Sequence, residues 1–160
     1  MIGSTPLIYA SRADAERLSL PYRLLSAGVA AGCAAVLIIA AGLKPDPSGV
    51  ATHTRLGLQK CWMLDHIGIP CATCGMTTSF SHFAHGNLLA SFYVQPMGAV
   101  LATLASIAFW IALYLALTGR PALRLMHLFP MRHLTVGMLF FALLAWGWKI
   151  MIHLSGMDGW

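Results

Sequence analysis

Long apolar runs with at most one charged residue recur along the chain, and each has the length of a membrane-crossing helix. A hydrocarbon core about 30 Å thick requires roughly 20 apolar helical residues. The runs that meet this requirement are residues 24–43, 97–117 and 134–154. Two prolines, Pro45 and Pro47, follow the first run, and the second lies between Pro96 and Gly119. Because such residues begin or end helices, the pattern predicts an all-α integral membrane protein with three transmembrane helices.

Composition supports this class of protein. Hydrophobic residues make up 58% of the 160 residues and charged residues 9%, with a mean hydropathy of +0.73. Soluble domains carry roughly 45–50% apolar and about 25% charged residues, so a soluble monomer is excluded. A net charge of +5 suggests nucleic acid binding in a soluble protein, but in a membrane protein it reflects basic residues beside the lipid. We therefore expect a single domain, 1–160, with the lipid bilayer and no nucleic acid as partner.

Lysine and arginine are distributed unevenly between the two sides of the predicted bundle. Residues 1–21 are mixed polar and apolar, and we interpret them as a surface segment ahead of a retained anchor. Basic residues remain in excess on the cytoplasmic side. We therefore expect a bacterial inner-membrane protein with a cytoplasmic N-terminus and with loop 44–95 and the C-terminus on the periplasmic side. The basic residues inside are Arg12, Arg17, Arg23, Arg120, Arg124 and Arg132, against Lys44, Arg55, Lys60 and Lys149 outside.

One of these basic residues, Lys149, lies inside the third run. It stands about one and a half helical turns from the end of that run. A long lysine side chain near a helix end can extend its ammonium to the membrane surface. We expect Lys149 to do so, at an interface marked by Trp146, Trp148 and Trp160 as an aromatic belt.

Small residues four positions apart predict where membrane helices pack closely. Gly28 and Gly32 form such a pair in the first run, and Gly98 and Ala102 form another in the second. Helices in lipid associate through close backbone packing, which small residues permit. We expect the first two helices to pack against each other, or one of them to pack against another membrane protein or a second copy.

Loop 44–95 contains three of the four cysteines, and Pro70 precedes a Cys-x-x-Cys pair formed by Cys71 and Cys74. The residues from about Cys74 to Ala84 have helical spacing and end at a His-Gly-Asn step. One face of this helix is polar and the opposite face apolar, which is typical of an interfacial or re-entrant helix too short to cross. The polar face, expected to point toward water or a site, comprises Cys74, Thr78, Ser81, His82 and His85, and the apolar face comprises Met76, Phe80 and Phe83.

A Cys-x-x-Cys pair can form a disulfide, bind a metal ion or attach haem, and c-type haem requires a histidine where this chain has Gly75. Because exported cysteines tend to oxidise, we favour a structural or labile disulfide. The alternative is a zinc or copper site, although the nine residues between Cys61 and Cys71 match no common zinc pattern. Catalytic thiol exchange is the third alternative. The candidate redox residues are Cys61, Cys71 and Cys74, and the candidate ligands are the same three with His66, His82 or His85.

The individual cysteines are expected to differ in reactivity. A cysteine at the start of a helix has a lowered pKa, because unpaired backbone amides favour the thiolate. We therefore expect Cys74, or the pair it forms with Cys71, to be more reactive, or better suited to metal, than Cys33, which lies among small residues in the first run and serves packing. The remaining histidines, which we interpret as loop or interface residues without a chemical role, are His53, His127, His133 and His153.

No other group of residues indicates catalysis. The five acidic residues are scattered, and the chain has no phosphate-binding glycine loop or nucleophile elbow. Three helices also enclose too little space for a solitary transporter. We therefore expect no catalytic residues and no enzyme activity, but an accessory or scaffolding subunit of a larger membrane assembly. The alternative function is a thiol-redox or metal-handling membrane protein that uses the Cys-x-x-Cys segment.

The segment from Cys61 to Gly98 resembles a family of small, uncharacterised bacterial membrane proteins. That family is marked by Gly-x-Pro-Cys-Pro-x-Cys-Gly-(Leu/Met)-Thr, a short helix, a Gly-Asp or Gly-Asn step and an Asn-Pro pair before the next membrane helix. This chain carries Gly-Ile-Pro-Cys-Ala-Thr-Cys-Gly-Met-Thr, then Gly-Asn and Gln-Pro. It departs from the pattern at Ala72, Thr78 and Gln95. The resemblance implies a membrane location and a functional motif, and it names no reaction.

Overall fold

The computed structural model describes residues 18–120 and 131–158, and these residues form helices joined by loops, with no strand among them. Three helices are long and apolar enough to cross a membrane. The predicted all-α architecture with three membrane-spanning helices is therefore confirmed. The elements are α2 (Leu20–Gly42), η1 (Thr52–Leu56), α3 (Trp62–Ile67), α4 (Met76–Ala84), α5 (Leu88–Val94), α6 (Pro96–Thr118) and α7 (Met131–Leu154).

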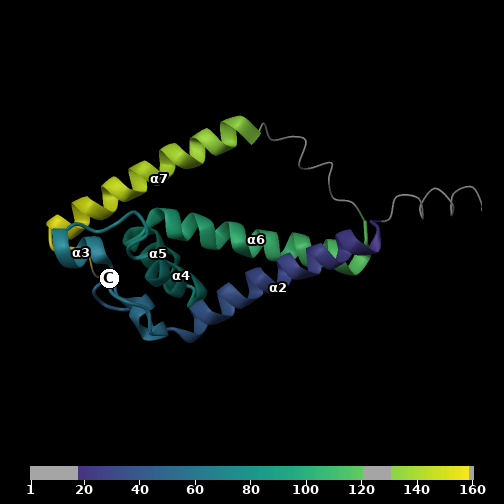
Figure 1. The fold of residues 1–160 in the computed structure, drawn as a ribbon, viewed down its shortest axis with the longest axis horizontal. Helices are drawn as coiled ribbons and strands as arrows, with labels where there is room; N and C mark the ends of the chain where they lie inside the picture. The colour runs from purple at the N-terminus through teal and green to yellow at the C-terminus, as the bar shows by residue number, and fades with distance from the viewer. Residues whose placement is uncertain (1–17, 121–130, 159–160) are drawn as a thin grey trace, which may run out of the picture.

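Helices α2 and α6 pack against each other as an antiparallel pair, which confirms the expected contact between the first two spans (Figure 1). At the end where α2 begins, the Arg23 guanidinium donates to the carbonyls of Ala116, at 3.1 and 3.0 Å, and Leu117, at 3.3 Å. These carbonyls lie in the last turn of α6, where no backbone amide follows to bond them and where a cation is favoured. Arg23 therefore joins the start of one span to the end of the other.

The short helices α4 and α5 lie between the opposite ends of α2 and α6 (Figure 1). Asn87 begins α5 by accepting a hydrogen bond from the backbone N–H of Ala90 at 3.1 Å. Ser79 on α4 donates to the Ser91 carbonyl at 2.8 Å, and its hydroxyl lies where a side chain on Gly98 of α6 would collide with it. The absence of a side chain at Gly98 thus allows α4 to approach α6 closely.

The short helix predicted after the Cys-x-x-Cys pair is α4. Thr78 and Ser81 of its polar face point into the protein, whereas His85 at its C-terminal end is exposed. Thr78 is buried, and its hydroxyl lies 2.8 Å from that of Thr52 on η1. Ser81 is also buried and donates a hydrogen bond to the carbonyl of Leu43, just beyond α2. These contacts satisfy the buried hydroxyls within the protein, so α4 is attached on its polar face to η1 and to the end of α2.

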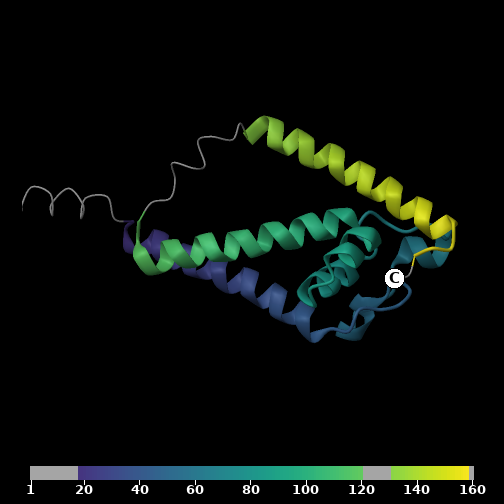
Figure 2. The same cartoon turned by 180° about the vertical axis from the view of Figure 1, so that it is seen from behind.

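Helix α7 diverges from α6 toward its N-terminal end and approaches the other helices at its C-terminal end (Figure 2). Two tryptophans of the expected aromatic belt lie at this attachment. Trp146 donates its indole N–H to the carbonyl of Pro70 at 3.0 Å, and Trp148 donates to the carbonyl of Tyr93 at 2.8 Å. The third, Trp160, lies outside the described residues. Both described tryptophans thus use their polar atoms to connect α7 to the loop and to α5.

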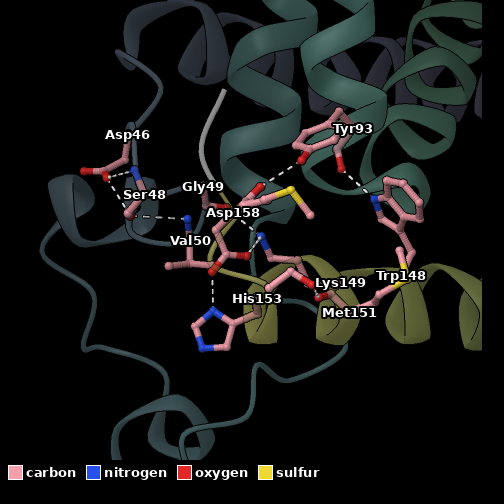
Figure 3. A network of polar contacts seen from close by, with 12 residues as sticks. Asp46, Ser48, Gly49, Val50, Tyr93, Trp148, Lys149, Met151, His153 and Asp158 are labelled. Carbon is pink, nitrogen blue, oxygen red and sulfur yellow. Dashed lines mark hydrogen bonds and ion pairs between the residues drawn. The ribbon is translucent and has the colours of Figure 1, made fainter.

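The expectation that Lys149 extends to the membrane surface is wrong. Its side chain is completely buried, and its ammonium pairs with the Asp158 carboxylate at 3.0 Å (Figure 3). The Gly49 carbonyl lies 3.5 Å from the same nitrogen, and His153 contacts the other carboxylate oxygen of Asp158. Asp158 can reach Lys149 because the chain turns back after α7 ends. The opposite charge and these partners make burial of the ammonium tolerable.

The four predicted packing residues lie in two different environments. Gly98 and Ala102 of α6 are buried against α4 and α2. Gly28 and Gly32 of α2 are exposed, and no atom of the described residues would meet a side chain built on either of them. Gly98 and Ala102 of α6 therefore pack within this chain, whereas Gly28 and Gly32 of α2 face outward.

Candidate metal centre

The first cysteine of the cluster is positioned by a short helix. Cys61 is the residue before α3, and its carbonyl accepts a hydrogen bond from the Asp65 backbone at 3.0 Å. Gly68 then ends α3 with a positive φ of 72°. After this single helical segment the chain reaches Pro70 and the second and third cysteines. The turn therefore brings Cys61 close to Cys71, which lies ten positions later in the sequence.

The loop that carries Cys71 and Cys74 is held from several sides. Within the loop, the Cys74 N–H donates a hydrogen bond to the Cys71 carbonyl at 3.0 Å, which closes a backbone turn. Trp146 bonds the carbonyl that precedes the loop, and Gln95, which is completely buried, donates its side-chain N–H to the Ala72 carbonyl at 2.8 Å. The junction between α5 and α6, through Gln95, and helix α7, through Trp146, thus fix the position of the two cysteines.

Gly75, the residue after Cys74, is required by both conformation and space. Its φ of 83° is one that residues with side chains rarely adopt. A Cβ atom there would lie 2.7 Å from the Gly49 carbonyl oxygen and 3.4 Å from the Lys149 nitrogen. The end of the cysteine loop therefore packs directly against the buried ion pair of Lys149 and Asp158.

The three loop cysteines meet at one point. The sulfurs of Cys71 and Cys74 are 3.4 Å apart, and those of Cys61, Cys71 and Cys74 all lie within 4.8 Å of one another. Sulfurs bound tetrahedrally to zinc at about 2.3 Å are about 3.8 Å apart. The three sulfurs are thus close enough to bind one metal ion. Cys33 lies on α2, half-buried and outside this cluster.

Electrostatics distinguish two cysteines of the cluster. Burial tends to raise the pKa of Cys61, but the backbone N–H of Leu64 and the thiols of Cys74 and Cys71 lower it overall, from an ordinary 9.0 to about 7. Burial raises the pKa of Cys74 far above its ordinary value, and its hydrogen bonds to Cys61 and Cys71 act in the same direction. Cys61 therefore ionises more readily than Cys74.

The expectation of a lowered pKa at Cys74 is therefore wrong. Cys74 precedes α4 by two residues, because Gly75 occupies the position that caps this helix. Cys74 is also only 4% exposed, so loss of water around the thiolate outweighs any favourable field from the helix. The helix-start position belongs instead to Cys61, at α3.

None of the three histidines considered as a fourth ligand joins the sulfur cluster. His66 is exposed, stacks on Trp62 with ring centroids 4.8 Å apart, and contacts the Trp62 carbonyl at 3.1 Å. His85 donates through Nδ1 to the Ser81 carbonyl at 2.7 Å. His82 lies on α4, where burial, and then the charge of His85, lower its pKa.

A different histidine lies beside the cysteines. His53 on η1 lines a pocket of about 360 Å³ together with Cys61, Cys71 and Cys74. From the sequence alone, His53 is interpreted as a loop or interface residue without a chemical role. The only feature of the sequence that could have indicated His53 as a ligand is its location in the same loop as the cysteines.

The comparisons with known proteins agree with an uncharacterised family. A family model described as "Protein of unknown function (DUF2752)" matches residues 61–111, from the first loop cysteine through most of α6. The expected resemblance to an uncharacterised family is therefore confirmed. No curated protein and no solved structure matches the chain.

Proposed function

We propose that this membrane protein binds a zinc or copper(I) ion through Cys61, Cys71 and Cys74, in the loop between its first two spans. The observation that supports the proposal is the convergence of three sulfurs from two separate segments. Thiolates are soft ligands that select these metals. A disulfide would require Cys71 and Cys74 to close by about 1.3 Å and would leave the third sulfur unbonded.

The surroundings of the sulfurs favour a metal that can exchange. Cys61 and Cys71 are half-buried, and the pocket beside the cluster has a volume of about 360 Å³. Zinc sites with a purely structural role are closed by four protein ligands, whereas sites that leave a position open remain accessible. Three sulfurs beside a pocket support a role in holding and releasing the ion, which is the metal-handling alternative stated above.

The orientation that accompanies this proposal places the cluster on the periplasmic side of a bacterial inner membrane. The cysteine loop and the C-terminal end of α7 lie at one end of the bundle, and the start of α2 lies at the other (Figure 1). This agrees with the sidedness expected from the basic residues. A membrane-impermeant thiol reagent should label Cys61 in intact cells. Labelling only after the membrane is opened would reverse the orientation.

Metal analysis of the protein purified in mild detergent tests the proposed function. The protein should contain, or take up, one zinc or copper(I) ion per chain. Cys61→Ser should weaken metal binding at least tenfold, because a hydroxyl is a poor ligand for these ions. Cys33→Ser is the matched control and should leave metal binding unchanged, since Cys33 lies on α2 outside the cluster.

Mass spectrometry of alkylated protein distinguishes the other outcomes. Two thiols that resist alkylation until a reductant is added would indicate a disulfide and support the redox interpretation. Three freely alkylated loop thiols, with no metal taken up after anaerobic reduction, would contradict both the metal-binding proposal and the redox interpretation. In that case the cysteines serve only packing.

An accessory role in a larger membrane assembly is a second candidate, and it is compatible with metal binding. It is favoured by the open space at Gly28 and Gly32, where a second helix could approach α2 closely. Mild extraction should then recover the protein with another membrane protein or as a self-associated species. Migration as a lone monomer after gentle cross-linking would contradict this role.

A further inference from the structure

His53 is the described histidine best placed to complete the cysteine cluster. It lies between two pockets, one of about 360 Å³ that it shares with all three cysteines and one of about 260 Å³ that it shares with Cys61. The side chain is half-buried and lines the same pocket as the three cysteines.

The hydrogen bonding of His53 leaves one ring nitrogen available. Its Nε2 lies 3.1 Å from the carbonyl oxygen of Gln59 and donates to it when the proton is on that nitrogen. No hydrogen bond is found for Nδ1 within the described residues. Histidines that bind metals commonly donate their other N–H to a backbone carbonyl, which fixes the ring and exposes a lone pair.

The segment that carries His53 is fixed close to the cysteine loop. Its neighbour Thr52 is completely buried, accepts from the Asp46 backbone N–H at 2.9 Å, and shares the hydrogen bond of 2.8 Å with Thr78 on α4. Helix α4 follows Cys74 by two residues. The same contact thus locates both η1, with His53, and the end of the loop with Cys74.

We propose that His53 is the fourth ligand of the metal centre, through Nδ1, and that the resident ion is zinc. This inference rests on the proposed metal-binding function. Three thiolates with one imidazole form a ligand set typical of tetrahedral zinc, whereas copper(I) is satisfied by three sulfurs. No ring nitrogen of His53 belongs to the sulfur cluster in this structure, so closing the site requires the imidazole to move within its pocket until Nδ1 reaches the ion. Its release would reopen the position through which zinc exchanges.

The test uses the full chain in detergent, with zinc or cobalt(II) as the probe. X-ray absorption of the zinc-loaded protein should show three sulfur ligands and one nitrogen ligand with imidazole scattering. His53→Ala should remove the imidazole signal and weaken zinc binding at least about tenfold, since loss of even an outer-shell partner costs 10–100-fold. His53→Cys should retain one zinc with four sulfurs, which shows that the variant segment still folds.

His66→Ala is the matched control, because His66 is an exposed histidine on α3 that lines neither pocket. It should keep the imidazole signal and the affinity of the unchanged protein. If Cys61→Ser abolishes zinc binding but His53→Ala leaves the affinity and imidazole signal unchanged, the inference is overturned and the proposed function stands. If the unchanged protein binds no zinc, both fall.

Discussion

The two ends of the bundle are built differently. At the end with the cysteine loop, completely buried polar side chains such as Lys149, Gln95 and Ser79 connect helices and loops that are distant in sequence. At the opposite end, α2 and α6 are joined mainly by Arg23, which bonds partly exposed carbonyls. Apolar surface explains why the long helices enter lipid, but it does not determine which faces of the helices pack against each other. The buried polar contacts at one end provide that specificity.

The largest loss of stability at the cysteine-loop end is expected from Asp158→Ala. The change leaves the Lys149 ammonium completely buried without its carboxylate. Loss of one partner from a buried ion pair costs about 3 kcal/mol or more. Unfolding in mixed detergent micelles should show this loss of stability, and limited proteolysis should cut more readily near the C-terminus.

The double variant Lys149→Met with Asp158→Asn provides the control for this prediction. It removes the buried charge together with its partner, so it should recover most of the lost stability. If Asp158→Ala proved as stable as the unchanged protein, the ion pair would not fasten α7, and the contrast between the two ends would lose its strongest element.

A smaller but still clear effect is expected from Gly98→Ala. The added Cβ would lie 2.7 Å from the Ser79 hydroxyl and 2.8 Å from the Ser79 Cβ, so α4 and α6 must separate. Overpacking of this kind costs about 1–3 kcal/mol. The same micelle unfolding measures it. A variant of unchanged stability would show that α4 is free to shift away from α6.

At the opposite end, Arg23→Ala should cost about 1 kcal/mol, because its hydrogen bonds are partly exposed and its charge lies near a helix C-terminus. Arg23→Lys keeps the charge but not the planar fork, so it should recover only part of the difference. A loss as large as that from Asp158→Ala would mean that the two ends contribute equally.

The smallest effect is expected from Gly28→Ala on α2. No described atom lies within reach of the added methyl group, and alanine favours helix over glycine by about 1 kcal/mol at most. The purified single chain should therefore be unchanged or slightly more stable. Loss of an associated protein or second copy on native gels, with the single chain unaffected, would identify this outward face as an interface.

The spans and α4 could be predicted because local patterns determine them. Uncharged runs of the right length, with Pro96 at the start of α6, leave few alternatives in lipid, and the polar and apolar faces of α4 have helical spacing. Their ends were also signalled by proline and glycine. What these patterns could not show is that the polar face of α4 is satisfied by Thr52 and Leu43 and not by water.

The candidate site could be predicted only in part, because it is formed by contacts between segments that are distant in the sequence. The Cys-x-x-Cys pair was evident, but the turn through α3 that returns Cys61 to the pair has no spacing signature. His53 lines the pocket beside the cluster because η1 lies against α4, where Thr52 contacts Thr78. Lys149 was assigned to the membrane surface because its charge was considered alone, without the return of Asp158.

Helix α7 is attached to the other helices near its C-terminal end, so a small tilt there would move its N-terminal end by a larger distance. Its 24 residues extend about 36 Å. Toward its C-terminal end, Trp146 contacts the cysteine loop, Trp148 contacts α5 and Lys149 contacts Gly49. A tilt of about 10° at that attachment would displace the far end by about 6 Å. Pro70, which accepts the Trp146 hydrogen bond, immediately precedes Cys71. A small tilt of α7 at the cysteine loop would therefore produce a larger displacement at its N-terminal end.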